Sequence, residues 1–176
     1  PQTSIAICIA STGELMRVDL HDESTTDLKL NGVTRIEASP AGEAFLAIAG
    51  SEIHTFLKSG KAVASYGLLG EPLSISVADE ASAAAVTVAE AEGEALYLTD
   101  ERGARRLLQS SHFAAITFLP NSKDFLVAEE SGAIHRVGSD LQLTQVGSVP
   151  GIKALAGTPD GSRLLAVTEQ MIYSIH

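Results

Sequence analysis

The chain contains no tryptophan, only one cysteine, and no hydrophobic run close to the ~18 residues that a membrane-spanning helix needs. The single Cys8 excludes a disulfide within the chain and leaves the redox compartment open. Without a long apolar segment, or a basic leader in front of one, we expect a soluble chain with no membrane insertion. Because 45 % of the 176 residues are hydrophobic, we expect one globular domain over residues 1–176.

Positive charge is also scarce. The chain has 12 Lys and Arg residues against 22 Asp and Glu residues, which gives a formal net charge of −10. Such a chain repels nucleic-acid phosphates and anionic membrane surfaces, so we expect no nucleic-acid partner. The common catalytic signatures are missing as well: a glycine-rich phosphate loop, a GxSxG elbow, an HExxH helix and paired cysteines. We therefore expect no cofactor and no metal ligand set, and a non-enzymatic role is favoured.

A repeat of about 40 residues runs through the chain. Turn positions recur at intervals of 40, 40 and 39 residues, at Pro40, Glu80, Pro120 and Pro159. A short apolar run follows each turn, and a fifth copy precedes them all. The centres of these runs are Cys8, Ala47, Thr87, Val127 and Ala166. Five copies in one register predict five structural units.

Each unit has the character of β-strands joined by tight turns, because its short runs are rich in β-branched and aromatic residues between Gly, Pro, Asp and Ser. In the second unit we predict strands over residues 35–39, 44–49, 52–57 and 62–66. Four short antiparallel strands in such a unit are typical of one blade of a β-propeller. The sequence therefore predicts an all-β chain with about five blade-like units; a Greek-key sandwich is the structural alternative.

The two end units are incomplete. The first begins at its second strand and the last ends at its third, so we predict units of 3, 4, 4, 4 and 3 strands. A partial ring of this kind leaves strand edges open, and open edges invite pairing with other strands. We expect the ring to be completed by the remainder of a larger propeller, or by self-association with a second copy.

The repeats resemble those of bacterial propellers of the YVTN and NHL type. The likeness is carried by "TPDGSRLLAVT" (residues 158–168), by "SPAGEAFLAIA" (residues 39–49), and by third strands that end in aspartate at Asp19 and Asp100. The Trp-Asp ending of WD-type repeats is absent. The resemblance implies a propeller from a group that includes sugar lactonases, surface-layer proteins and binding modules, and it suggests a bacterial extracytoplasmic location.

Four single residues are candidates for chemistry. Cys8 falls at a position occupied by small residues in the other units, so we expect it to pack between blades. His54 and His135 share a position on the third strand, two units apart, and packing is favoured over zinc binding there. Their counterparts in the other units are Met16, Leu96 and Ile172. His112, in a connection between units, is the better candidate for binding, although the sequence reveals no fixed carboxylate partner for it.

The strongest functional signal is a set of glutamates in the turns between second and third strands. In a propeller these turns lie on one face of the disc, and no Lys or Arg occurs within them. The glutamates expected to be exposed on this face are Glu52, Glu90, Glu92, Glu129, Glu130 and Glu169. We predict a non-enzymatic binding module that presents this acidic face, with His112, to a basic protein segment, a cation or another small ligand. The plainer alternative is that these glutamates only keep the surface soluble.

The alternative function is a propeller hydrolase of the lactonase type, with a metal at the central channel. The channel candidates lie on the first strands and are Arg35, Glu37, Ser74, Ser76, Thr117 and Lys153. Because this set mixes both charges, it is poorly suited to a cation cage, and the binding module is favoured.

Overall fold

The computed structural model of the chain describes residues 4–158, 160 and 162–175, which fold into strands and turns without a helix. The strands form five sheets in chain order. The first sheet contains β1 (Ile5–Ile9), β2 (Leu15–Asp19) and β3 (Thr25–Asp27), and the second contains β4 (Val33–Ala38), β5 (Ala44–Ala49), β6 (Glu52–Leu57) and β7 (Ala62–Gly67). The third sheet contains β8 (Pro72–Val77), β9 (Ala83–Glu90), β10 (Gly93–Asp100) and β11 (Gly103–Ser110), and the fourth contains β12 (Phe113–Phe118), β13 (Phe125–Glu129), β14 (Ala133–Val137) and β15 (Leu143–Ser148). The fifth sheet contains β16 (Ile152–Gly157), β17 (Leu164–Thr168) and β18 (Ile172–Ile175).

Every sheet is an antiparallel meander in which consecutive strands pair. The predicted all-β organisation into five units of three or four strands is confirmed. Two predicted strands of the second unit, residues 44–49 and 52–57, coincide with β5 and β6, and the other two differ from β4 and β7 by at most two residues. The apolar runs form strands because bulky and β-branched side chains pack well on a pleated, buried surface.

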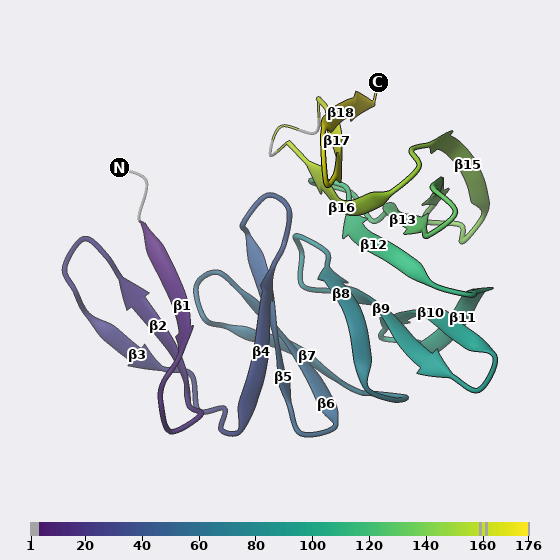
Figure 1. The fold of residues 1–176 in the computed structure, drawn as a ribbon. Coiled ribbons are helices and arrows are strands. Elements are labelled where there is room, and N and C mark those ends of the chain that lie inside the picture. The colour runs from purple at the N-terminus through teal and green to yellow at the C-terminus, as the bar shows by residue number, and fades with distance from the viewer. Residues whose placement is uncertain (1–3, 159, 161, 176) are drawn as a thin grey trace.

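The five sheets follow one another along an open arc (Figure 1). The first strands of neighbouring sheets lie next to each other, since β4 contacts β8, β8 contacts β12, and β12 contacts β16. The fourth strands, β7, β11 and β15, form the opposite edges of their sheets. Over the described residues, the sheets therefore stack side by side with their first strands on the inside of the arc, and the arc does not close into a ring.

The hydrophobic core lies between neighbouring sheets, and one cluster fills each gap. The second strands β5, β9 and β13 are almost wholly buried because each has a sheet on both sides. This double burial explains why their sequences are continuous apolar runs and do not alternate with polar residues. Phe45 and Phe56 stack within the second sheet with ring centroids 5.0 Å apart, so aromatic pairs add to the packing of the inner strands.

The register of the third sheet differs from the prediction by one residue. Ala47 in β5 pairs with Ile36, which packs toward the first sheet. In the third sheet Val86 pairs with the equivalent Ile75, so Val86 and not Thr87 occupies the predicted central position. A shift of one residue moves a strand side chain to the opposite face of its sheet. The side chain of Thr87 consequently lies on the face of the third sheet that is turned toward the fourth sheet. Its Oγ1 accepts the N–H of Ser74 at 3.0 Å.

In two of the third strands, the residue at the central position also differs from the predicted one by one place. The residues that pair with the central positions of the second strands are Met16, His54, Tyr97, His135 and Tyr173. Tyr97 replaces the predicted Leu96, and Tyr173 replaces the predicted Ile172. The turns between second and third strands differ in length from sheet to sheet, so the residue that pairs with the central position is fixed by the strand register and not by the repeat period. Four of the five residues at this position, two His and two Tyr, therefore carry an aromatic ring with a polar group.

A buried carboxylate joins three sheets at the turns between first and second strands. Asp79, only 7 % exposed, lies in the turn between β8 and β9. Its Oδ1 accepts the N–H of Ala41 at 2.9 Å and its Oδ2 accepts the N–H of Asn121 at 2.7 Å. These partners lie in the corresponding turns of the second and fourth sheets. Asp79 thus fixes the spacing of three consecutive sheets at this end.

The corresponding turn of the fifth sheet contains Pro159 and Gly161, which lie outside the described residues, so the turn predicted from "TPDG" is only partly visible. Asp160 between them accepts hydrogen bonds from Thr158 Oγ1 at 2.5 Å and from the Ser162 N–H at 3.1 Å. These donors, Thr158 first, lower the pKa of Asp160 from 3.8 to about 2. The ionised carboxylate of Asp160 therefore accepts the hydrogen bonds that hold this turn together.

Candidate functional site

The turns between second and third strands lie at one end of the sheets, together with the connections between sheets. The Ser51 carbonyl accepts the N–H of Leu68 at 2.8 Å, and the Gly132 carbonyl accepts the N–H of Val149 at 2.8 Å. Asp79 lies at the other end of the same sheets. We call the first end the glutamate end, defined by Glu52, Glu90, Glu92, Glu129, Glu130 and Glu169. The predicted glutamates thus share an end by topology.

Three of these glutamates lie close to a polar aromatic side chain on the third strand of their own sheet. Glu52 Oε2 lies 3.3 Å from His54 Nε2, and Glu129 Oε1 lies 3.0 Å from His135 Nε2. In the third sheet, Tyr97 donates its hydroxyl proton to Glu90 Oε1 at 2.6 Å. That hydrogen bond, more than partial burial, raises the pKa of Tyr97. Tyr97 thus orients Glu90 by a hydrogen bond, whereas His135 Nε2 has no hydrogen-bond partner among the described residues, so the repeated ring position orients a carboxylate in the third sheet and not in every sheet.

Other polar side chains compensate part of the acidic charge. Arg106 of β11 donates to Glu90 Oε2 at 2.5 Å, and Lys153 Nζ of β16 lies 3.7 Å from Glu169 Oε1. Ser110 Oγ donates to the remaining oxygen of Glu129 at 3.1 Å. The turns themselves contain no basic residue, but neighbouring strands bring two to them. Sequence reasoning missed these partners because they are distant in the chain.

Glu92 and Glu130 differ from the other predicted glutamates. Both are exposed, and among the residues that the structure describes neither side chain takes part in a hydrogen bond or ion pair. Glu92 lies in the two-residue turn between β9 and β10, and Glu130 directly follows β13. Their charges are the ones most available to a ligand at the glutamate end.

His112 has a fixed carboxylate partner, and the sequence-based view that it has none is wrong. Its Nδ1 contacts Glu94 Oε1, while Glu94 Oε2 accepts the N–H of Phe113 at 2.8 Å. Glu94 is buried, with 8 % of its surface exposed, whereas the side chain of His112 is half exposed. The carboxylate therefore holds the ring and the start of β12 together. No local pattern could reveal this pair, because its members are 18 residues apart, with Glu94 on β10 and His112 in the connection between β11 and β12.

Cys8 is exposed, which corrects the expectation that it packs between blades. Its side chain leaves β1 on the face that turns away from the second sheet, because Ile7 and Ile9 occupy the other face. The described residues place no further sheet on that side. The position is an interior one in the second, fourth and fifth sheets, where Ala47, Val127 and Ala166 are buried.

The inner strands hold the candidates for a channel site. Arg35 donates from Nη1 to the Leu73 carbonyl at 3.3 Å, so it bridges β4 and β8. Partial burial raises the pKa of Glu37, and nearby Arg35 opposes the shift. Within the described ranges, no group of three or more His, Cys, Asp or Glu side chains has an arrangement that could hold a metal ion. The hydrolase alternative stays a prediction without an assigned ligand set.

The described residues thus define an all-β protein of five stacked antiparallel sheets, with carboxylates at one end. No helix in the described part of the chain is long and apolar enough to span a membrane. No protein-family model matches the chain, and no curated protein matches it.

Among solved structures, the chain is similar to hydrazine synthase of Kuenenia stuttgartiensis, with a TM-score of 0.62 and 13 % sequence identity. The match covers 97 % of this chain and 61 % of that one, so this chain spans less than two thirds of its structural neighbour. At this identity the likeness concerns the fold alone. The resemblance to YVTN and NHL repeats stays a prediction.

Proposed function

We propose that the chain is a partial β-propeller that acts as a non-enzymatic binding module and presents the glutamate end to a basic protein segment. Five sheets of one topology, stacked with their first strands inside an arc, support the propeller arrangement. The free edges of the first and last sheets support the further proposal that additional strands complete the ring.

The observation that carries the binding proposal is the exposure of Glu92 and Glu130 beside carboxylates that are held in place. Glu90 and Glu129 accept hydrogen bonds from Tyr97 and Ser110, so a ligand meets charges whose positions are already fixed. A cluster of negative charge attracts cationic segments over a distance of about one Debye length and accelerates their association. Lys or Arg side chains of the partner would pair with the free carboxylates.

The experiment compares two double variants that remove the same charge from different ends. Glu92→Gln with Glu130→Gln changes the glutamate end. Glu80→Gln with Glu101→Gln changes two exposed acids away from it, in the β8–β9 and β10–β11 turns, and serves as the matched control. Binding of an immobilised arginine-rich peptide is measured at about 0.01 M and about 0.15 M ionic strength, where the Debye length falls from ~30 Å to ~8 Å.

We expect the first variant to weaken peptide binding about fivefold at low salt, because two exposed ion pairs together contribute about 1 kcal/mol. The control should change binding much less, and both effects should shrink at the higher salt. Equal losses in the two variants would mean that the peptide senses only the net charge of −10, and the glutamate end would then be a solubility feature.

A further inference from the structure

A cleft lies between the third and fourth sheets, at the end of the sheets that contains Asp79. It has a volume of about 210 Å³. The β8–β9 and β10–β11 turns form one wall, and the β12–β13 and β14–β15 turns form the other, so four-stranded sheets bound the cleft on both sides. Sites for drug-sized ligands typically have about 300–1,000 Å³. The smaller cleft therefore suits an ion or a small molecule.

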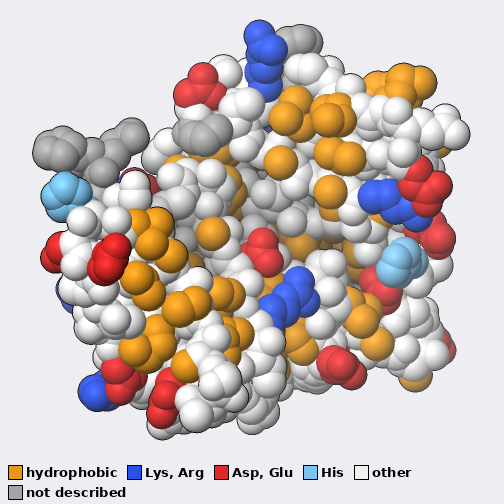
Figure 2. All heavy atoms as spheres, turned by 60° about the vertical axis from the view of Figure 1, so that its left-hand side comes forward, with side chains coloured by type: hydrophobic (Ala, Val, Ile, Leu, Met, Phe, Trp, Pro, Cys, Tyr) orange, Lys and Arg blue, Asp and Glu red, His pale blue; other side chains and the backbone are white. Residues whose placement is uncertain are grey.

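Three positively charged side chains gather at this cleft. Arg102 lies in the β10–β11 turn, Arg105 on β11 and Lys123 in the β12–β13 turn, so they come from both walls. On the face of the molecule that Figure 2 shows, by contrast, the Lys and Arg side chains lie apart from one another. Three of the 12 Lys and Arg residues of an acidic chain thus share one small cleft, which favours an anionic ligand.

The acids near the cleft leave part of this positive charge free. Asp100 pairs with Arg105 and also accepts the backbone N–H of Arg102 at 2.9 Å. Lys123 Nζ lies 3.8 Å from Glu80 Oε2, which is a long contact between two exposed side chains. The side chain of Arg102 makes no hydrogen bond or ion pair with any residue that the structure describes. Arg102 and Lys123 are therefore available to an anion, and Arg105 adds a charge whose position Asp100 fixes.

The gap between the second and third sheets is closed at the corresponding place. Thr55 Oγ1 donates to the Ala81 carbonyl at 2.7 Å. The Tyr66 hydroxyl donates to the Ser82 carbonyl at 3.0 Å. These two hydrogen bonds tie the outer strands of the second sheet to the β8–β9 turn of the third.

Between the third and fourth sheets both donors are missing. Their counterparts on β10 and β11 are Leu98 and Leu108, which carry no polar group. The corresponding carbonyls of the β12–β13 turn belong to Ser122 and Lys123, and no side chain within the described ranges donates to either. The gap consequently stays open at this end and contains the cleft.

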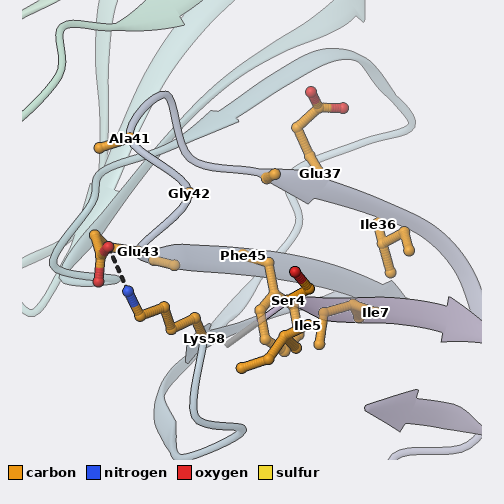
Figure 3. A pocket seen from close by; sticks show the side chains of 12 residues that line it. Ser4, Ile5, Ile7, Ile36, Glu37, Ala41, Gly42, Glu43, Phe45 and Lys58 are labelled. Carbon is orange, nitrogen blue, oxygen red and sulfur yellow. Dashed lines mark hydrogen bonds and ion pairs between the residues drawn. The ribbon is translucent and has the colours of Figure 1, made fainter. Parts of the chain in front are cut away.

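One pair of positions shows how the charge of the cleft differs from that of another sheet. Figure 3 shows the ion pair of Lys58 with Glu43 in the second sheet. In the fourth sheet the same two positions contain Ser139 and Lys123, which both line the cleft. A hydroxyl thus replaces the base and a base replaces the acid. Among the described residues, Lys123 is left with only its long contact to Glu80 of the third sheet.

We propose that this cleft binds a phosphate group, either the free ion or the phosphate of a small molecule. Arg102 and Lys123 face it from opposite walls, and both side chains make strong, charge-assisted hydrogen bonds to phosphate oxygens. The Ser139 hydroxyl, on the same wall as Lys123, would donate a further hydrogen bond. A tetrahedral group offers oxygens to both walls at once, whereas a carboxylate has only two oxygens in one plane. The site lies opposite the glutamate end and does not depend on a basic partner there.

The test follows backbone amide signals by NMR while sodium phosphate is added to the whole chain, with chloride keeping the ionic strength constant. The amides of Arg102, Lys123 and Ser139 should shift and saturate by about 10 mM phosphate, where a site with a Kd of about 1 mM is about nine-tenths filled. The amides of Ser51 and Glu92, at the glutamate end, should stay in place. Glycerol phosphate is the second arm. Tighter binding of this ester would identify a small molecule as the source of the phosphate, and tighter binding of inorganic phosphate would identify the free ion.

Single-charge variants separate the cleft from the overall charge. Arg102→Gln should weaken phosphate binding about threefold, because it removes one exposed ion pair with the ligand. Glu101→Gln should strengthen binding by about the same factor, because Glu101 lines the cleft and repels an anion. Lys61→Gln is the matched control for Arg102→Gln, since Lys61 is exposed between β6 and β7 at the same end and lies outside the cleft. It should change binding little.

The proposal is overturned if the cleft amides show no saturating shift in either arm, or if Arg102→Gln and Lys61→Gln weaken binding equally. It is also overturned if sodium acetate produces the same saturating shifts, because the cleft would then accept anions of any shape. The peptide experiment at the glutamate end is independent of these outcomes, since it involves other residues and a ligand of opposite charge.

Discussion

Replacing Asp79 tests whether one carboxylate holds three sheets together. Asp79 is 7 % exposed, and its two oxygens accept the backbone N–H groups of Ala41 and Asn121 at 2.9 and 2.7 Å. A hydrogen bond to a charged group contributes about 1.5–3 kcal/mol. Asp79→Asn keeps one acceptor oxygen and loses one of the two bonds, so we expect a loss of about 1.5–3 kcal/mol. Asp79→Ala loses both and leaves two N–H groups unpaired, so its loss should be about twice as large.

The assay is urea unfolding followed by circular dichroism. With a slope of about 2 kcal/mol per M, Asp79→Asn should lower the unfolding midpoint by about 1 M. Glu80→Gln is the matched control, because Glu80 is the next residue, is exposed, and makes only a 3.8 Å ion pair with Lys123. The control should shift the midpoint by less than about 0.3 M. In the same samples the amides of Ala41 and Asn121 should exchange faster. Equal midpoints for Asp79→Asn and Glu80→Gln would refute the reasoning.

Three further predictions follow from single contacts. Gly132→Ala should destabilise the fold by about 2 kcal/mol or more, because the added Cβ would lie 2.8 Å from the Val149 carbonyl oxygen; Gly103→Ala, at a similar positive φ but in open space, should cost only about 1 kcal/mol by thermal unfolding. Thr158→Val should raise the pKa of Asp160 from about 2 toward 3.8 in an NMR titration. Since the folded state lowers this pKa, its stabilising effect is present above pH ~4 and is lost as the pH falls toward 2, and an unchanged titration would refute the assigned cause. Glu90→Gln should lower the pKa of Tyr97, whose hydrogen bond to Glu90 raises it, and a constant Tyr97 titration would contradict this.

The strands could be predicted from the sequence because both their turns and their buried runs carry local signals. Residues 44–49 and 52–57 became β5 and β6 without adjustment, since polar turn residues bound each apolar run. The third sheet was misaligned by one residue because "AAAVTVAE" is apolar in either register, and only pairing with Ile75 selects Val86. The role of Asp79 was missed for the same reason, because the alignment placed Glu80 opposite the prolines of the other turns.

The glutamates could be assigned to one end from the repeat, but their partners could not. Arg106, Lys153 and Ser110 reach Glu90, Glu169 and Glu129 from other strands. Glu94 and His112 likewise meet because β10 pairs with β11, which places Glu94 opposite Ser110, two residues before His112. Such contacts depend on sheet register and on the distance between sheets, which no local pattern encodes. The distinction between the free charges of Glu92 and Glu130 and the compensated ones therefore required the structure.

The most direct test of the central claim is to map where a basic peptide binds by NMR chemical-shift changes across the backbone amides. The account predicts that an arginine-rich peptide shifts the signals of the glutamate end, around Ser51, Glu92 and Glu130, at low ionic strength. The amides of Ala41, Glu80 and Asn121, in the turns at the opposite end, should stay in place. Shifts of similar size at both ends, or none at the glutamate end under saturating peptide, would contradict the proposal that this end is the binding face.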